Sequence, residues 1–101
     1  MAVAHKTPLF LHDLEQVMEY LEERSPKAAE DLAAELDRTC ELLAVQTGLG
    51  RPRNDLCPGA RSVVVGKYVL IYSIAADGID ALRFIHGSRD LKAAFNESEP
   101  D

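Results

Sequence analysis

The side chains best suited to chemistry lie in the second half of the chain, where single arginines and one histidine accompany apolar segments: Arg61, Arg83, Arg89 and His86. An imidazole can exchange a proton near neutral pH, and guanidinium groups can bind anions such as carboxylates or RNA phosphates. The same groups, together with Tyr72, could instead bind the carboxylates and apolar side chains of a protein partner. The residues alone therefore leave two interpretations open, an acid–base site with anion-binding arginines and a surface that recognises a protein partner.

Each of these residues also has a structural interpretation. An arginine among apolar strand residues is costly to bury without an anionic partner, so Arg61 or Arg83 could pair with Asp55, Asp80 or Asp90. His86 ends a predicted strand before Gly87 and fits a hydrogen-bonding corner. Tyr72 fits a packing role, with its hydroxyl at the wet end of a sheet.

Other kinds of site find little support in the sequence. Cys57 and His86 have no evident third partner for nucleophilic catalysis, and the three histidines lack the spacing of metal ligands. No glycine-rich phosphate-binding loop is present. Cys40 and Cys57 read as reduced thiols. We therefore expect no metal and no cofactor.

The charge of the chain is unevenly distributed. The net charge is −6 over 101 residues, but residues 1–50 carry 4 basic and 10 acidic side chains, whereas residues 51–92 carry 7 basic and 4 acidic ones. Nonspecific binding of nucleic acid requires concentrated positive charge, which an acidic chain with only a mildly basic second half lacks. Direct binding of nucleic acid is therefore not expected.

The length fits one domain, spanning residues 1–101. No apolar run is long enough to cross a bilayer, and the first six residues lack the apolar core of a signal peptide. The sequence predicts a cytoplasmic protein without membrane contact.

Two helix-start signals occur in the first half. Thr7-Pro8 and Ser25-Pro26 each place a capping side chain before a proline, which is favoured at the first helical position. Apolar residues then recur at helical spacing from Phe10 to Leu21 and from Ala29 to Ala44. Because few residues connect the two segments, an antiparallel helical hairpin is predicted.

Strand signals follow at residues 61–65, 68–74 and 79–85, which are rich in β-branched and aromatic residues. Gly66-Lys67 forms a two-residue hairpin turn and residues 76–78 close a second one. Residues 2–6 could add one edge strand, residues 48–59 form a loop, residues 90–95 form a helical turn, and residues 96–101 are expected to fray. The predicted fold is α+β: an N-terminal helical hairpin packed on a small antiparallel sheet of three to four strands, with a short C-terminal helical turn.

Both faces of this predicted sheet are apolar. Strict alternation puts Tyr68, Leu70, Tyr72 and Ile74 against Val69 and Ile71, and puts Leu82 and Phe84 against Ile79, Ala81 and Ile85. One helical hairpin can cover only one face. The sequence therefore predicts that a partner chain covers the second face. The alternative is that the C-terminal segment folds back over it.

The order of these features resembles the ParE branch of the RelE/ParE superfamily of toxins. The resemblance runs from Thr7 to Phe95 and is carried by short pieces at matching spacing: Thr7-Pro8, Asp13-Leu14, Tyr20, Ser25-Pro26-Lys27-Ala28-Ala29, Gly50-Arg51-Pro52, Leu56, Pro58-Gly59, Arg61-Ser62, Tyr68, Tyr72 and Arg83 followed by His86-Gly87-Ser88-Arg89-Asp90. Residues 2–6 depart from the longer first strand of the family.

The resemblance implies the toxin of a type II toxin–antitoxin pair, bound and neutralised by a cognate antitoxin. ParE-like members are expected to inhibit DNA gyrase, and RelE-like members to cut ribosome-bound mRNA. The family also implies that the antitoxin or target contacts Arg61, Tyr72, Arg83, His86 and Arg89.

Residue content favours the gyrase interpretation. RelE-like chains have a cation-rich middle and usually a C-terminal tyrosine or histidine, whereas Lys67 is the only lysine between Lys27 and Lys92 and no tyrosine follows Tyr72. We therefore expect a binding protein rather than an enzyme. An RNase using His86, Arg61, Arg83 and Arg89, or an inactive partner-binding module, are the alternatives.

Overall fold

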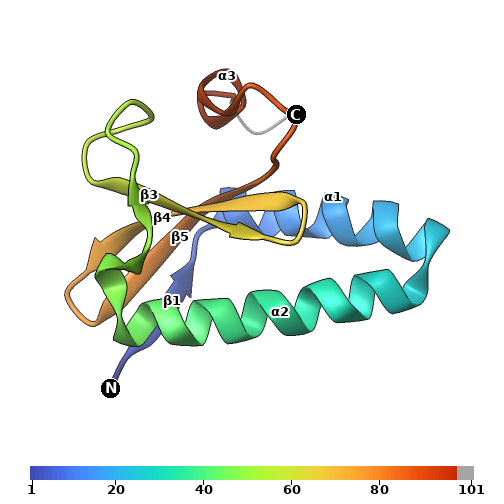
Figure 1. Ribbon diagram of the computed structural model, residues 1–101, viewed down its shortest axis with the longest axis horizontal. Helices are drawn as coiled ribbons and strands as arrows, with labels where there is room; N and C mark the ends of the chain where they lie inside the picture. Colours follow the sequence, from blue (N-terminus) through green and yellow to red (C-terminus); the bar gives the residue numbers. More distant parts are fainter. Residues whose placement is uncertain (98–101) are drawn as a thin grey trace.

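The computed structural model describes residues 1–97, so most of the segment predicted to fray, residues 96–101, lies outside the described part. One five-stranded sheet carries the helical hairpin on one face and a short C-terminal helix on the other (Figure 1). The elements in chain order are β1 (Val3–Lys6), α1 (Pro8–Arg24), α2 (Pro26–Val45), the 3₁₀ turn η1 (Thr47–Leu49), β2 (Arg51–Pro52), β3 (Ala60–Val65), β4 (Tyr68–Ala75), β5 (Gly78–His86) and α3 (Leu91–Phe95).

The helical hairpin forms as its capping residues predict. The Thr7 hydroxyl accepts a hydrogen bond from the Phe10 backbone N–H (3.3 Å) and also donates to the carbonyl of Ala81 in β5 (2.9 Å). Ser25 ends α1 by donating its backbone N–H to Leu21 (2.7 Å), and its hydroxyl caps α2 by accepting from Ala28 (3.2 Å). Ser25 thus both ends α1 and caps α2, and this short connection is typical of an antiparallel helical hairpin.

The sheet has five strands rather than three to four, in the order β1-β5-β4-β3-β2, and it is mixed rather than antiparallel. The first strand pairs in parallel with β5, which confirms the predicted edge strand at residues 2–6. Gly78 makes this pairing possible, because a Cβ there would overlap the Val3 carbonyl. The strand β2 was missed because it has only two residues, one of them a proline, inside a loop-like segment.

A β-bulge on β5 corrects the predicted alternation. Ile71 pairs with Arg83 whereas Tyr72 pairs with Ala81, so Leu82 is the extra residue. A bulge resets which side chains share a face. Phe84 therefore packs in the same cluster as Ile79 and Ala81, and not opposite to them as strict alternation predicts.

The prediction that a partner must cover the second face of the sheet is wrong, and the alternative holds. The main core lies between the hairpin and the sheet and includes Phe10, Leu36, Leu43, Leu70, Tyr72 and Phe84. A second cluster on the other face joins Val69, Ile71 and Ile85 to Leu56 and Ala60 and to Ala94 of α3. The chain thus buries most of this second face by itself, because a loop residue and α3 cover it, while Val64 of β3 stays 73% exposed there.

Candidate binding groove between the hairpin and the sheet

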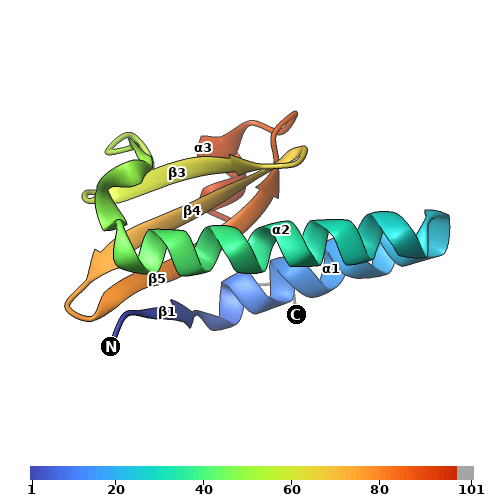
Figure 2. The ribbon, with the colours of Figure 1, turned by 60° about the horizontal axis from the view of Figure 1, so that its bottom comes forward.

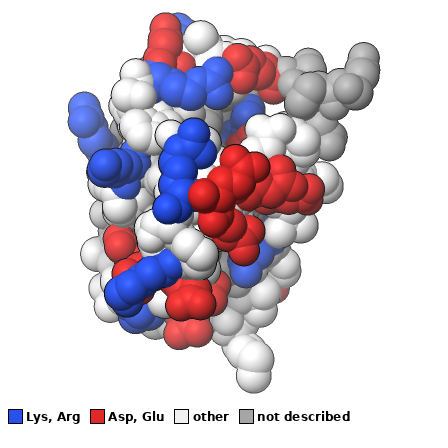
Figure 3. Space-filling model, turned by 90° about the vertical axis from the view of Figure 1, so that its right-hand side faces the viewer, with Lys and Arg blue, Asp and Glu red and all other residues white. Residues whose placement is uncertain are grey.

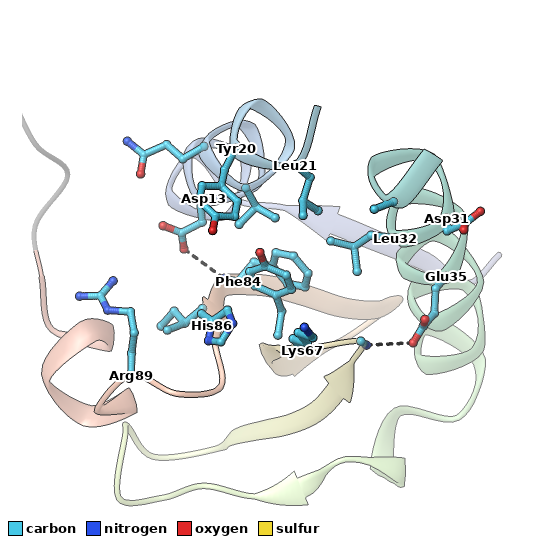
Figure 4. A pocket seen from close by; sticks show the side chains of 16 residues that line it. Asp13, Tyr20, Leu21, Asp31, Leu32, Glu35, Lys67, Phe84, His86 and Arg89 are labelled. Carbon is cyan, nitrogen blue, oxygen red and sulfur yellow. Dashed lines mark hydrogen bonds between the residues drawn. The ribbon is translucent and has the colours of Figure 1, made fainter. Parts of the chain in front are cut away.

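A groove of about 680 Å³ lies between the helical hairpin and one end of the sheet (Figure 4). Its apolar lining comes from both helices and both central strands: Val17, Tyr20, Leu21, Leu32, Tyr68 and Phe84. Its polar and charged lining includes Asp31 and Glu35 on α2 and, on the sheet side, the cations Lys67 and Arg89 together with the imidazole of His86. Such a mixture of apolar floor and separated charges suits a peptide segment better than a small polar substrate.

The groove exists because the helical hairpin extends beyond the end of the sheet. Figure 2 shows α1 and α2 continuing past the end of β3 and β4, so the last turns of α1 and the first turns of α2 overhang the sheet. The turn at Gly66 closes the inner end: its N–H donates to the Glu35 carboxylate (3.1 Å), and a Cβ on Gly66 would lie 3.3 Å from the Leu32 Cδ1. A glycine with φ of 60° at this position therefore lets the β3–β4 turn approach α2 closely.

An aromatic stack forms part of the floor. The rings of Tyr68 and Phe84 are stacked with centroids 5.1 Å apart, and the imidazole of His86 meets Tyr68 edge-on at 5.1 Å. Burial raises the pKa of the Tyr68 hydroxyl, so this phenol stays neutral near neutral pH. Tyr20 stands over the groove from α1, about half exposed, with the guanidinium of Arg24 stacked on its ring at 3.7 Å.

His86 is held by the turn that follows β5. Its Nδ1 accepts from the backbone N–H of Ser88 (3.1 Å) and lies 2.8 Å from the Ser88 hydroxyl oxygen. An Nδ1 that accepts from a backbone N–H leaves Nε2 as the protonated nitrogen of the neutral ring. The structure therefore shows the hydrogen-bonding corner, with a donor nitrogen left over. Arg89 lies on the groove rim beside it, half exposed, and pairs with Glu97 at 2.8 Å.

Arg83 is an interior residue and pairs with none of the predicted carboxylates. Its Nε and Nη2 donate to the two carboxylate oxygens of Asp13 on α1 (2.7 and 3.0 Å). Its Nη1 donates to the carbonyls of Ala94 (2.9 Å) and Phe95 (3.0 Å), at the end of α3. With 6% exposure, this guanidinium joins α1, β5 and the C-terminal helix.

Arg61 and Tyr72 lie at the opposite end of the sheet and bind the connection between α2 and β3. The Arg61 guanidinium donates to the carbonyls of Gly48 (3.2 Å) and Gly50 (2.7 Å). The Tyr72 hydroxyl accepts from the Gly50 N–H and donates to the Thr47 carbonyl, both at 2.8 Å. Tyr72 is fully buried, so its hydroxyl is not at a wet end of the sheet as predicted.

Of the five predicted site residues, the structure brings only His86 and Arg89 together at the groove, with Arg83 inside the molecule and Arg61 and Tyr72 elsewhere. Sequence reasoning missed Tyr20, Lys67, Asp31 and Glu35. Two signals were available: Tyr20 is an aromatic residue off the apolar stripe of α1, and Lys67 lies in a Gly-Lys turn. Asp31 and Glu35 belong to a series of acidic residues on the helices, and such a series normally indicates a solvent-exposed helix face.

Within residues 1–97, no cluster of three or more potential metal ligands occurs, and Cys40 and Cys57 are free thiols. Among the helices of the same part of the chain, none combines the length and apolar character needed to cross a bilayer.

Comparison with known proteins gives a consistent result. Residues 5–91 match the family described as the ParE toxin of the type II toxin–antitoxin system parDE. The chain is 32% identical over 82 residues to a protein named Toxin ParE1 from Caulobacter vibrioides, covering 80% of this chain and 84% of that relative. A solved structure titled Chromosomal ParDE TA system from P. aeruginosa shares the fold, with a TM-score of 0.70 over 85% of this chain and 96% of that one, at 19% identity.

Proposed function

This chain belongs to the ParE family of toxins of type II toxin–antitoxin systems, and we propose that it inhibits DNA gyrase by binding and that a cognate antitoxin neutralises it through the groove. The observation that carries the proposal is the groove itself, an apolar and aromatic channel with charges of opposite sign on its two sides.

Binding rather than RNA cleavage is supported by the separation of the candidate catalytic residues. Cleavage without a metal needs an acid–base group and several cations around one phosphate. Arg83 is engaged with Asp13, and Arg61 serves backbone carbonyls near the other end of the sheet. The side of the molecule seen in Figure 3 carries positive and negative side chains next to one another, which suits a protein surface better than a phosphate backbone.

The charges along the groove indicate how an antitoxin segment would lie. Apolar side chains of the antitoxin would contact Tyr20, Leu21 and Tyr68, and its carboxylates would face Lys67 and Arg89. Basic side chains of the same segment would face Asp31 on α2. In this proposal His86 and Arg89 contact the partner, whereas Arg83, Arg61 and Tyr72 hold the elements that shape the surface.

Gyrase supercoiling assays with purified protein test the proposal. The folded toxin should inhibit supercoiling, and toxin mixed with its antitoxin beforehand should not. A folded toxin that stops growth but leaves gyrase active would overturn the gyrase part. A Tyr20→Ala variant that inhibits gyrase but is poorly rescued by antitoxin would separate the groove from the target surface.

One observation keeps mRNA cleavage as a second candidate. His86 presents a donor nitrogen beside Arg89 in the groove, which is a minimal acid–base and cation pair. Ribosome-dependent cleavage that is lost in His86→Ala and Arg89→Ala variants with unchanged unfolding would support it. Folded protein with neither activity and no growth defect would indicate an inactive partner-binding module.

A further inference from the structure

The two cations of the groove lining differ in whether the chain itself already supplies an anion. Arg89 donates from Nη2 to the Glu97 carboxylate (2.8 Å), and both side chains are about half exposed. Lys67 makes no ion pair within residues 1–97. In the view of Figure 4, His86 lies between the two cations. A carboxylate of a partner can therefore reach Lys67 directly, whereas at Arg89 it meets a carboxylate of the same chain.

Glu97 is held beside Arg89 by the backbone around α3. Its N–H donates to the Ala94 carbonyl (3.2 Å), and its carbonyl accepts from Nη1 of Arg83 (3.4 Å). At the other end of the helix, the N–H of Arg89 donates to the His86 carbonyl (3.1 Å). Because these bonds do not involve the paired side-chain atoms, α3 can stay in place when the carboxylate and the guanidinium separate.

The contact uses only a small part of what Arg89 can donate. Among the described residues, the bond from Nη2 is its only side-chain hydrogen bond. Arg53, by contrast, binds Asp55 with both Nε and Nη2, each at 3.0 Å. Two parallel bonds to a carboxylate hold it more firmly than one, and an exposed ion pair contributes little. The pair of Arg89 and Glu97 is therefore one that a carboxylate from outside can replace.

The neighbouring carboxylates have structural tasks of their own. Asp13 lines the same groove, but both of its oxygens are bound by Arg83. Asp90 accepts from two backbone N–H groups at the start of α3. Within residues 1–97 the Glu97 carboxylate accepts only from Arg89, so it can leave without depriving any other donor.

We propose that Glu97 is an internal competitor of the antitoxin: its carboxylate occupies the place on Arg89 that a carboxylate of the bound segment takes, and binding exchanges one for the other. This inference rests on the proposed function of the groove and adds which contact of the chain has to open. The pair of Arg83 and Asp13 keeps α3 in place during the exchange. Glu97 thus lowers the affinity for antitoxin segments that carry an anion at this position.

Isothermal titration calorimetry of the purified toxin with its cognate antitoxin tests the exchange through Glu97→Gln. Glutamine keeps the backbone contacts of this residue but removes the competing charge, so affinity should rise roughly two- to fivefold, which corresponds to an exposed ion pair. Glu99→Gln is the matched control, because it removes the same charge two positions further on, outside the described residues, and it should have a smaller effect. Equal gains in the two variants would overturn the inference, since the charge of the segment and not the contact would then be responsible.

A double-mutant cycle assigns the gain to Arg89. Glu97→Gln should lose its effect in an Arg89→Met background, because no guanidinium is left for which two carboxylates compete. A gain of the same size in that background contradicts the exchange.

The same variants separate this inference from the proposed function of the groove. Tyr20→Ala and Arg89→Met should each weaken binding if the groove holds the antitoxin. If they do and Glu97→Gln changes nothing, the exchange alone is wrong. If neither of them weakens binding, the proposal for the groove fails together with this inference.

The ¹³C NMR signal of the Glu97 carboxylate gives a readout of the contact itself. The signal is identified by its absence from Glu97→Gln. On addition of antitoxin it should move to the position that it has in Arg89→Met, where the carboxylate lacks the guanidinium. A signal that keeps its position in the complex would mean that Arg89 and Glu97 stay paired, and the inference would be wrong.

Discussion

The two ends of the sheet use the same kinds of side chain for opposite purposes. At one end, Arg61 and the fully buried Tyr72 donate to backbone carbonyls within the chain. At the groove end, Tyr20 and Arg89 are about half exposed, and their nearest partners are other exposed side chains. The type of residue therefore does not identify a binding site. A side chain is available to a partner only when its polar atoms are not already hydrogen-bonded to the backbone of the folded chain.

The largest expected effect is the loss of Arg83. Replacing it with methionine leaves the carboxylate of Asp13 without its cation and removes donors from the end of α3. Breaking a buried ion pair costs roughly 3–5 kcal/mol, a large part of the stability of a domain of this size. Urea denaturation measures this change in the free energy of unfolding.

Arg89→Met is the matched control for that experiment. Its pair with Glu97 is exposed, and such pairs contribute about 0–1 kcal/mol. Similar losses in the two variants would contradict the division between interior and groove arginines. Adding Asp13→Leu to Arg83→Met removes the unpaired carboxylate and should recover part of the loss. The recovery is incomplete because the carbonyls of Ala94 and Phe95 still lack their donor and the Phe84 N–H loses its acceptor.

Tyr72→Phe probes the other end of the sheet. It deletes the hydroxyl that joins the Thr47 carbonyl to the Gly50 N–H, and leaving buried polar groups unsatisfied costs about 1–3 kcal/mol. Equilibrium unfolding should show this loss, and Tyr20→Phe should show none. A Tyr72→Phe variant as stable as the unchanged chain would mean that water replaces the hydroxyl.

Tyr20→Ala should weaken antitoxin binding while leaving the free energy of unfolding almost unchanged. Unfolding should change by no more than roughly 0.5 kcal/mol, while antitoxin affinity should fall about tenfold or more if this ring is an anchor of the interface. Isothermal titration calorimetry gives the affinity. Leu11→Ala is the control, since Leu11 is 48% exposed on the same helix but does not line the groove.

The smallest expected effect concerns pH and the edge strand β1. His5 Nε2 lies 2.9 Å from the Asp77 carboxylate; this hydrogen bond and charge raise the pKa of His5 and lower the pKa of Asp77. The histidine contribution is fully present below its unfolded pKa of 6.5 and is lost as pH rises through the folded value. The aspartate contribution is present above 3.8 and is lost as pH falls through its folded value.

The melting temperature of the unchanged chain should therefore exceed that of His5→Asn by more at pH 5 than at pH 8. His12→Asn serves as the control on the neighbouring helix. An equal difference at the two pH values would show that the pair does not contribute to the stability of β1.

Much of the fold could be predicted from local signals. Thr7-Pro8 and Ser25-Pro26 define both helix starts, and Gly66-Lys67 defines the β3–β4 turn, because caps and tight turns depend on a few consecutive residues. The bulge at Leu82 could not be predicted, since it depends on how β5 pairs with β4 across the sheet. The same limit applies to β2, whose two residues become a strand only through β3.

The candidate site was predicted less completely. Arg83 and Arg89 both resembled recognition residues in the sequence, and only Arg89 lies on the groove. Asp13 was the missing information: it is 70 residues away from Arg83 in the chain and reaches it through the packing of α1 on β5.

The sequence by itself determined the helical hairpin, the central strands, the family and the presence of two apolar sheet faces, since these follow from periodicity and from residues close together in the chain. Only the tertiary structure decided which of the charged and aromatic side chains remain available. Arg83 and Tyr72 are buried and hydrogen-bonded to distant segments, so they are not available to a partner. The overhang of the hairpin beyond the sheet leaves Tyr20, His86 and Arg89 facing the groove.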